Sequence, residues 1–212
     1  VQEGLAYRIA PVKTDESRPA EFGIIDHIVM YDNMMNKFEW GNLSGKNVYL
    51  DETNLRMCMN FRNNFARLAN ALLDEGQNKD GSFDNEKKTK AIAALDRCME
   101  VLPESAVPYN YFILPIAEAY YRAGEVQKAN AIVSRVIDLY EAELAYYYSL
   151  DKKRSNLLEF DKQQALFILQ RIMMITEETK QTDLFKKVEP VFAKYYGLYT
   201  GIPYQTVKDS AK

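Results

Sequence analysis

The stretch ILPIAEAYYRAGEVQKANAIV, residues 113–133, decides the fold, because its apolar residues have helical spacing on both sides of Gly124. The glycine separates a helix that ends here from one that starts at about Val126. An earlier stretch, FARLANALLDEG at residues 65–76, has the same order of apolar, small and glycine residues. The comparison predicts two related helical hairpins.

The two hairpins repeat at fixed offsets. Four positions of the first helix recur 48 residues later, and three positions of the second helix recur 38 residues later. The difference of ten residues predicts an insertion in the first turn, near residues 78–85. The matched pairs are Leu68/Ile116, Ala69/Ala117, Leu72/Tyr120 and Gly76/Gly124, then Ala91/Ala129, Leu95/Val133 and Cys98/Val136.

This pattern resembles the tetratricopeptide repeat, in which a small residue lies where the helices meet, a glycine follows near the turn and a proline closes the unit. The resemblance implies that Ala69 and Ala117 let paired helices approach closely. Pro103 closes the first unit, and Pro115 should kink its helix or mark the first turn. Any antiparallel helical bundle can show similar spacings, which is the alternative interpretation.

The remaining sequence is expected to cap this array, because two hairpins are fewer than the roughly three that a solenoid needs. The predicted fold is mostly α: a tetratricopeptide-like array of helical hairpins with a short N-terminal strand and loop. Three regions are predicted, namely residues 1–50 (strand, loop and capping helix), 51–150 (two hairpins) and 151–212 (a capping pair of helices near 161–179 and 182–196, then a tail).

Within residues 1–50, Leu5, Tyr7 and Ile9 alternate with less apolar neighbours, which indicates a short strand. The strand has no obvious partner, so it should pair with sequence upstream or lie along the helices. After the loop, the capping helix is predicted to place five apolar side chains on one face. They are Ile24, Ile28, Tyr31, Met35 and Phe38.

Composition indicates a folded chain with a weak overall field. The 212 residues include 27 basic and 30 acidic side chains, for a formal charge of −3. Basic residues form only short clusters, so nucleic acid is not an expected partner. No run approaches the roughly 18 apolar residues of a membrane span. The chain starts at Val1 without a signal-like segment, so we expect a piece of a longer polypeptide.

Few residues suit catalysis or metal binding, and no catalytic, cofactor or metal site is predicted. His27 is the single histidine, and no suitably spaced cysteine completes a zinc site around it. We expect a structural or surface histidine. Cys58 and Cys98 are expected to be buried free thiols, although helices running antiparallel could also bring them together as a disulfide.

A candidate binding surface follows from the hairpin pattern. Residues one turn away from the packing positions of each first helix should line a concave groove, and their amide, carboxylate, guanidinium and phenol groups could bind a peptide or glycan segment. The candidate residues are Asn63, Asn70, Asp74, Tyr111, Glu118, Tyr121 and Arg122.

Five segments carry a family resemblance: EGLAYR at 3–8, YDNMM at 31–35, FEWGN at 38–42, MNFRNNFARL at 59–68 and VPYNYFILPIAEAYYRAG at 107–124. They resemble the C-terminal soluble part of a bacterial family of multi-pass membrane proteins of unknown function, which is similar to protein O-mannosyltransferases. The resemblance implies that membrane helices precede this piece, which then lies at the periplasmic face of the inner membrane. The ten-residue insertion departs from the family's compact turn.

The expected function is a non-catalytic one, because the sequence combines the two-offset repeat with no catalytic constellation. The resemblance implies that catalytic acidic residues, as in lipid-linked-sugar glycosyltransferases, lie in loops of the membrane part. The domain should dock a protein or peptide segment, or brace the membrane part of its own chain. Two alternatives remain. One is a stand-alone enzyme with a site near the N-terminal segment around His27, and the other is a purely structural or oligomerisation module.

Overall fold

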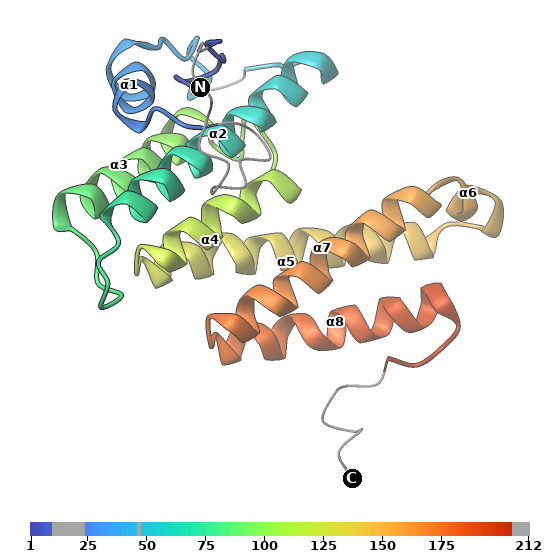
Figure 1. Cartoon of the computed structure of the whole chain (residues 1–212). Coiled ribbons are helices and arrows are strands. Elements are labelled where there is room, and N and C mark those ends of the chain that lie inside the picture. The colour runs from blue at the N-terminus through green and yellow to red at the C-terminus, as the bar shows by residue number, and fades with distance from the viewer. Residues whose placement is uncertain (10–23, 46–47, 205–212) are drawn as a thin grey trace. The chain divides into compact units, whose positions relative to one another are not determined.

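The computed structural model describes residues 1–9, 24–45 and 48–204, and the described chain is mostly helical (Figure 1). The chain divides into two compact units, Val1–Val126 and Gln127–Lys212. The first unit contains α1 (His27–Asp32), η1 (Asn33–Lys37), α2 (Glu52–Gly76), α3 (Asn85–Val101), η2 (Tyr111–Ile113) and α4 (Leu114–Arg122). The second contains nearly all of α5 (Val126–Ser149), then α6 (Lys152–Leu157), α7 (Glu159–Glu178) and α8 (Thr182–Thr200).

The hairpin of α2 and α3 organises the first unit. Asp51 starts α2 by accepting a hydrogen bond from the Asn54 backbone N–H at 2.9 Å, and Asp84 caps α3 in the same way. The helices come very close at Gly76, where an added Cβ would lie 2.7 Å from Cβ of Lys87. Glycine is therefore required for this close approach. The apolar side of α2 also packs against α4.

The predicted helices are confirmed, with ends close to those expected from the sequence. Pro115 lies in the first turn of α4, directly after the short η2 helix. It therefore marks the start of this helix and does not kink it. Of the fourteen matched repeat positions, all except Gly124 are buried. The tetratricopeptide-like stacking stays a prediction, and so does the division at residues 50 and 150. The structure itself divides the chain after Val126, which assigns α4 to the first unit and nearly all of α5 to the second.

The predicted N-terminal strand is wrong. Residues 1–9 form a tight reversal in which Gln2 makes isolated bridges to Tyr7 and to Ile25. The reversal occurs at Gly4, whose φ of +145° is a conformation that other residues rarely adopt. Leu5 and Tyr7 are consequently exposed, and their alternation with less apolar neighbours does not reflect a sheet.

The predicted packing face of the capping helix is also wrong. Met30 and Met34 are fully buried, whereas Ile28 is 69% exposed. The helix starts only at His27 and widens after Asp32 into the π-helix η1, where the Phe38 N–H donates to the Asn33 carbonyl at 2.8 Å. A wider turn changes which residues share a face, so a regular helical period misassigns them.

The second unit is built on the hairpin of α7 and α8, which turns at Lys180 with a φ of +59°. Lys187 on α8 holds α5 through Asp138 at 2.6 Å and the Ser134 hydroxyl at 2.8 Å. The short charged helix α6, which starts at its cap Asp151, was not predicted. Within the described ranges, no helix has the length and apolar character needed to cross a bilayer.

Candidate functional site

The structure brings together three of the seven predicted binding residues. Arg122 at the end of α4 donates through one guanidinium nitrogen to the Asn70 side-chain carbonyl at 2.5 Å and through another to an Asp74 carboxylate oxygen at 2.7 Å. Asn70 and Asp74 lie one turn apart on α2, so both face α4 on the same side. We call these three residues the polar cluster.

The polar cluster is both ordered and accessible. The side chain of Asp74 is 68% exposed, and that of Arg122 is 37% exposed. In the described part of the chain, the amide nitrogen of Asn70, the second carboxylate oxygen of Asp74 and Nε of Arg122 make no further hydrogen bond. The cluster therefore offers two donors and an acceptor on side chains that are oriented before any ligand arrives.

The other four predicted residues lie on α2, η2 and α4, outside the polar cluster. Asn63 is half-buried on α2, and Tyr111 in η2 is exposed with its ring edge against Phe112, 6.1 Å between centroids. Glu118 and Tyr121 are half-buried on α4, and burial raises the pKa of Tyr121 to about 12. The role of these four residues in binding stays a prediction.

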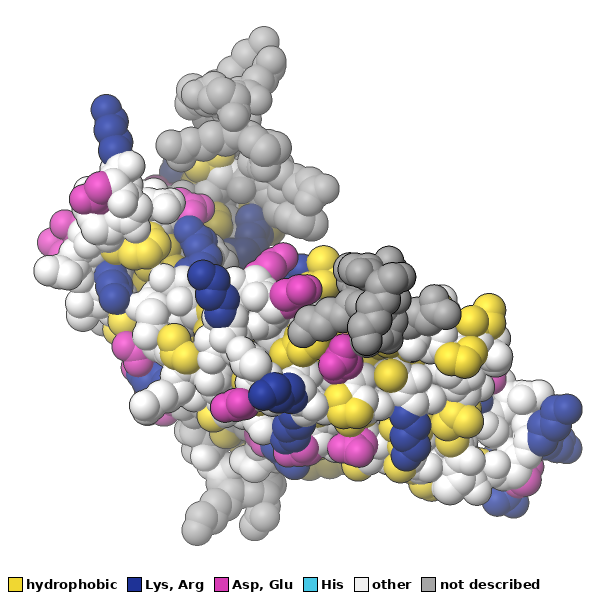
Figure 2. All heavy atoms as spheres, turned by 90° about the horizontal axis from the view of Figure 1, so that it is seen from below, with side chains coloured by type: hydrophobic (Ala, Val, Ile, Leu, Met, Phe, Trp, Pro, Cys, Tyr) yellow, Lys and Arg dark blue, Asp and Glu magenta, His cyan; other side chains and the backbone are white. Residues whose placement is uncertain are grey.

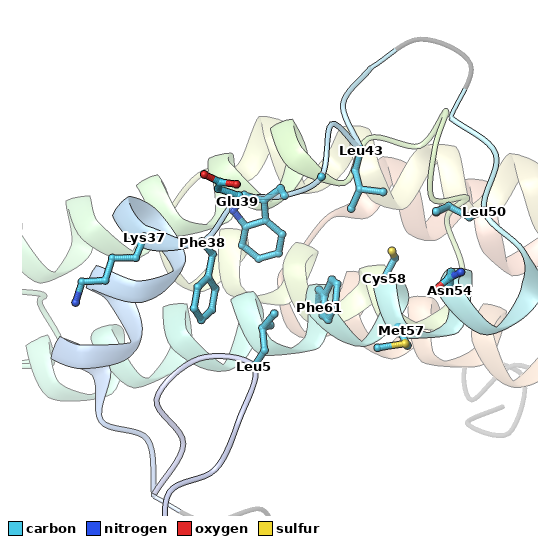
Figure 3. Close-up of a pocket in the computed structure, with 12 residues that line it drawn as sticks. Leu5, Lys37, Phe38, Glu39, Leu43, Leu50, Asn54, Met57, Cys58 and Phe61 are labelled. Carbon is cyan, nitrogen blue, oxygen red and sulfur yellow. The ribbon is translucent and has the colours of Figure 1, made fainter.

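A pocket at the other end of α2 was missed by the sequence analysis. It has a volume of about 490 Å³ and a mainly apolar lining (Figure 3). The walls come from the N-terminal reversal, from the end of η1 with the segment that follows it, from the loop before α2 and from the first half of α2. The lining residues are Leu5, Lys37, Phe38, Glu39, Trp40, Gly41, Leu43, Leu50, Asn54, Met57, Cys58 and Phe61.

An aromatic cluster contributes to the wall of the pocket. The Trp40 ring lies 6.2 Å from Phe38 and 5.9 Å from Phe61, both edge to face, and 5.1 Å from Phe65. Gly4 seats the N-terminal reversal on this cluster, because a Cβ at Gly4 would lie 2.8 Å from the Phe38 ring. The closely spaced Phe38, Trp40, Phe61 and Phe65 were the available signal, but sequence alone does not distinguish a packed cluster from the wall of a cavity.

The N-terminal reversal is fixed by polar contacts as well. The buried Gln2 amide donates to the Gly4 carbonyl at 2.8 Å and to the Asn64 side-chain carbonyl on α2 at 3.0 Å. The Asn33 amide donates to the Glu3 carbonyl at 2.7 Å. These bonds tie the reversal to both η1 and α2, so Leu5 is held in the pocket wall.

His27 lies in a small ionic group at the start of α1. Its Nε2 contacts the Glu75 carboxylate of α2 and lies 3.3 Å from the Lys87 ammonium of α3, which in turn pairs with Glu75 at 2.9 Å. The pocket beside Trp40 does not include His27. The group connects α1, α2 and α3, which is compatible with a structural role for His27. For the enzyme alternative, Glu75 is the one carboxylate that contacts His27 among the described residues.

The two cysteines are free and buried, as predicted. Cys98 is completely enclosed, and desolvation raises the pKa of its thiol to about 12. Burial also raises the pKa of the Cys58 thiol, although Cys58 lines the pocket. The two thiols thus differ in their access to the pocket.

Arg62 is a second feature that the sequence analysis missed. Its side chain is fully buried, and its guanidinium donates to the backbone carbonyls of Leu102 at 3.1 Å, Pro108 at 2.8 Å and Val107. The Tyr109 ring lies 5.1 Å from the guanidinium carbon. Arg62 therefore fixes the segment that connects α3 to α4, and its role is structural.

Comparison with known proteins does not identify the chain: no protein-family model, curated protein or solved structure matches it. Among the described residues there is also no group of three or more His, Cys, Asp or Glu side chains placed to hold a metal ion. The family resemblance of the sequence is therefore a hypothesis, and the polar cluster and the pocket are the features on which function must be argued.

Proposed function

We propose that this chain is a non-catalytic helical domain that docks a protein or peptide segment. The single observation that supports the proposal is the polar cluster. Asn70, Asp74 and Arg122 are accessible, held in place by one another and left with both donors and an acceptor for a ligand. An extended peptide backbone presents the complementary carbonyl and N–H groups at short intervals.

The polar cluster suits docking because its side chains are already oriented, so a ligand loses little binding free energy to ordering them. The guanidinium is already oriented by two hydrogen bonds, so a ligand does not have to order it. Arg122 is positively charged and Asp74 is negatively charged. This pair favours a ligand that has both donors and acceptors, such as a peptide backbone, over a simple ion.

Selection of peptides tests this proposal. The full chain is immobilised, and binders are selected from a random peptide display library. We expect selected peptides to bind at least about tenfold more weakly to Arg122→Ala and to Asp74→Ala, because each change removes charge-assisted contacts. Glu141→Ala, an exposed change on α5, is the control and should bind normally. Selected peptides that bind all three variants equally, and that leave the emission of Trp40 in the separate pocket unchanged, would overturn the assignment of this surface.

The cellular setting is part of the same proposal. By the family resemblance, the domain is tethered at the periplasmic face of the inner membrane and serves a membrane glycosyltransferase-like part of its own chain. The sequence upstream of Val1 in the gene tests this setting. A hydrophobic region with several spans is the expected result, and a short signal peptide alone would contradict it.

An oligomerisation module is the second candidate function, and one observation favours it. Phe160, Phe167 and Met174 recur every seven residues on α7, and each is about half exposed or more, with Phe160 at 74%. A seven-residue apolar repeat is typical of helix pairing. Light scattering tests this candidate: a dimer that Phe160→Ser converts to a monomer supports it, and a monomeric wild-type chain rejects it.

A further inference from the structure

We propose that the pocket beside Trp40 binds a short peptide segment that combines a bulky apolar side chain with basic neighbours. This is a second binding site, of different chemistry from the polar cluster. Phe61 at the pocket and Asn70 in the cluster are nine residues apart on α2, which corresponds to about 13 Å along the helix. The inference does not depend on the polar cluster.

The size and the walls of the pocket favour an apolar group. A volume of about 490 Å³ is within the range of roughly 300–1,000 Å³ that is usual for ligand pockets. Leu5 and Met57, at its wall, are 40% and 54% exposed, so apolar surface remains open to solvent. In Figure 3, Leu5, Phe61 and Met57 border the cavity from below, and Leu43 and Leu50 lie above it. Covering this surface would release water from it.

The pocket is also preorganised. Trp40 is fixed by Phe38, Phe61 and Phe65, so its ring does not need to be ordered by a ligand. Indole and benzene rings in this arrangement attract cations as well as apolar groups, because their faces carry negative charge. A lysine or arginine next to an apolar side chain would therefore find a suitable surface.

The charges at the rim point to a basic ligand. The Lys37 ammonium points away from the cavity and is paired with Asp32 at 2.6 Å. Among the described residues, Glu39 lines the pocket without a hydrogen-bonding or ion-pairing partner. Of the two charged lining residues, Glu39 thus keeps an unpaired negative charge at the described rim, which complements lysine or arginine.

Titration followed by intrinsic fluorescence tests the proposal, because Trp40 is the single tryptophan and lies in the pocket wall. The probe is the peptide acetyl-Lys-Leu-Phe-Lys-amide, compared with acetyl-Glu-Leu-Phe-Glu-amide and acetyl-Lys-Ser-Ser-Lys-amide. We expect a saturable change of Trp40 emission with the first peptide, with weaker binding of the acidic peptide and no saturation with the serine peptide. Equal responses to the basic and acidic peptides would overturn the charge assignment, and a saturable response to the serine peptide would overturn the apolar one.

Three variants of the full chain complete the test. Glu39→Lys should weaken binding of the basic peptide by about fivefold, with a smaller difference at high salt. Arg122→Ala and the exposed control Glu141→Lys should bind as the wild type does, which separates this site from the polar cluster. Unchanged binding to Glu39→Lys would contradict the proposal. So would Trp40 emission that shifts with protein concentration alone, since a second copy of the chain would then occupy the pocket.

Discussion

Arg62 is the residue whose environment differs most from what its type suggests. Burying a guanidinium is costly because its charge loses hydration, and the negative charge of Glu104 offsets part of that cost at Arg62. Here it donates to the backbone carbonyls of Leu102, Val107 and Pro108, which lie 40 to 46 residues further along the chain. Desolvation lowers the pKa of Arg62, but a guanidinium stays charged in proteins. Its two terminal nitrogens thus hold a segment that has no regular structure of its own.

We predict that Arg62→Ala destabilises the first unit by about 3 kcal/mol, because it leaves buried carbonyls without donors and opens a cavity. Urea unfolding followed by Trp40 fluorescence measures this change, since both residues lie in the first unit. The matched control is Arg56→Ala on the same helix, where an exposed pair with Glu52 should cost below about 0.5 kcal/mol. Equal midpoints for the two variants would contradict the prediction, because the loss of Arg62 would then cost no more than the loss of the exposed Arg56.

The two thiols should differ in reactivity. At pH 8 the Cys98 thiol, with a pKa of about 12, is almost entirely protonated, and it is also enclosed. Because burial raises the pKa of the Cys58 thiol, its thiolate fraction between pH 7 and 9 is smaller than that of an exposed thiol, and it increases with pH. We therefore predict that a thiol reagent labels Cys58 slowly, faster as the pH is raised from 7 to 9, and labels Cys98 only after unfolding. Mass spectrometry of Cys58→Ser and Cys98→Ser assigns each label, and labelling of Cys98 in the folded chain would contradict the prediction.

At the scale of elements, the close approach of α2 and α3 depends on one glycine. Gly76→Ala should favour the helix by about 1 kcal/mol through propensity, but its Cβ would overlap Cβ of Lys87. Because that atom is fixed to the α3 backbone, we predict a net destabilisation of about 1–2 kcal/mol. Thermal unfolding followed by Trp40 fluorescence measures it.

Gly197 on α8 provides the opposite case. A Cβ at Gly197 would meet only the Ile202 carbonyl at 3.8 Å, an ordinary contact, so Gly197→Ala should stabilise α8 by about 0.5–1 kcal/mol. Far-ultraviolet circular dichroism during heating tests this change. Two helical glycines with opposite responses would show that helix packing, rather than propensity, requires Gly76. Stabilisation by both alanines would reject that explanation.

The helices with an unbroken apolar period could be predicted from the sequence, because each period and its end signals lie within one element. Asp51 and Gly76 delimit α2, and Pro103 follows α3, as expected. The errors arise where local patterns are ambiguous. Leu5 and Tyr7 alternate as strand residues do, yet the positive φ of Gly4 turns the chain. A π-helix, likewise, leaves no clear signal in the apolar period.

The candidate sites could be predicted from the sequence only in part, because some of their contacts join segments that are far apart in the chain. Asn70, Asp74 and Arg122 follow from helical periodicity together with the repeat offset of 48 residues, which makes Asp74 and Arg122 equivalent positions near the ends of α2 and α4, so three predicted residues converge. The pocket depends on four segments, including the reversal at Gly4, and the burial of Arg62 depends on a distant connection. Contacts between segments that are far apart in sequence are not encoded in any local pattern.

At the scale of the whole molecule, charges of both signs are mixed over the described residues of the face that Figure 2 shows. Figure 2 shows Lys and Arg side chains among Asp and Glu side chains over the face in view, and the chain carries a formal charge of −3. The exposed sequence Lys152-Lys153-Arg154 is a basic cluster on α6, but Asp151 caps that helix and lies 3.3 Å from Nε of Arg154. Such a surface gives a weak field beyond a Debye length of about 10 Å at 0.1 M salt.

We predict that nucleic acid does not bind this chain appreciably. Non-specific binding needs several phosphates neutralised at once, and its affinity then falls steeply with salt. Fluorescence anisotropy of a labelled single-stranded oligonucleotide, at low and at physiological salt, measures it. The expected result is no saturation below about 100 µM protein at either salt concentration, with no difference between the wild type and a variant that carries Lys152→Ala, Lys153→Ala and Arg154→Ala. Binding that is steep in salt and lost in this variant would instead make α6 a phosphate-binding element, and the peptide-docking proposal would then have to explain a second class of ligand.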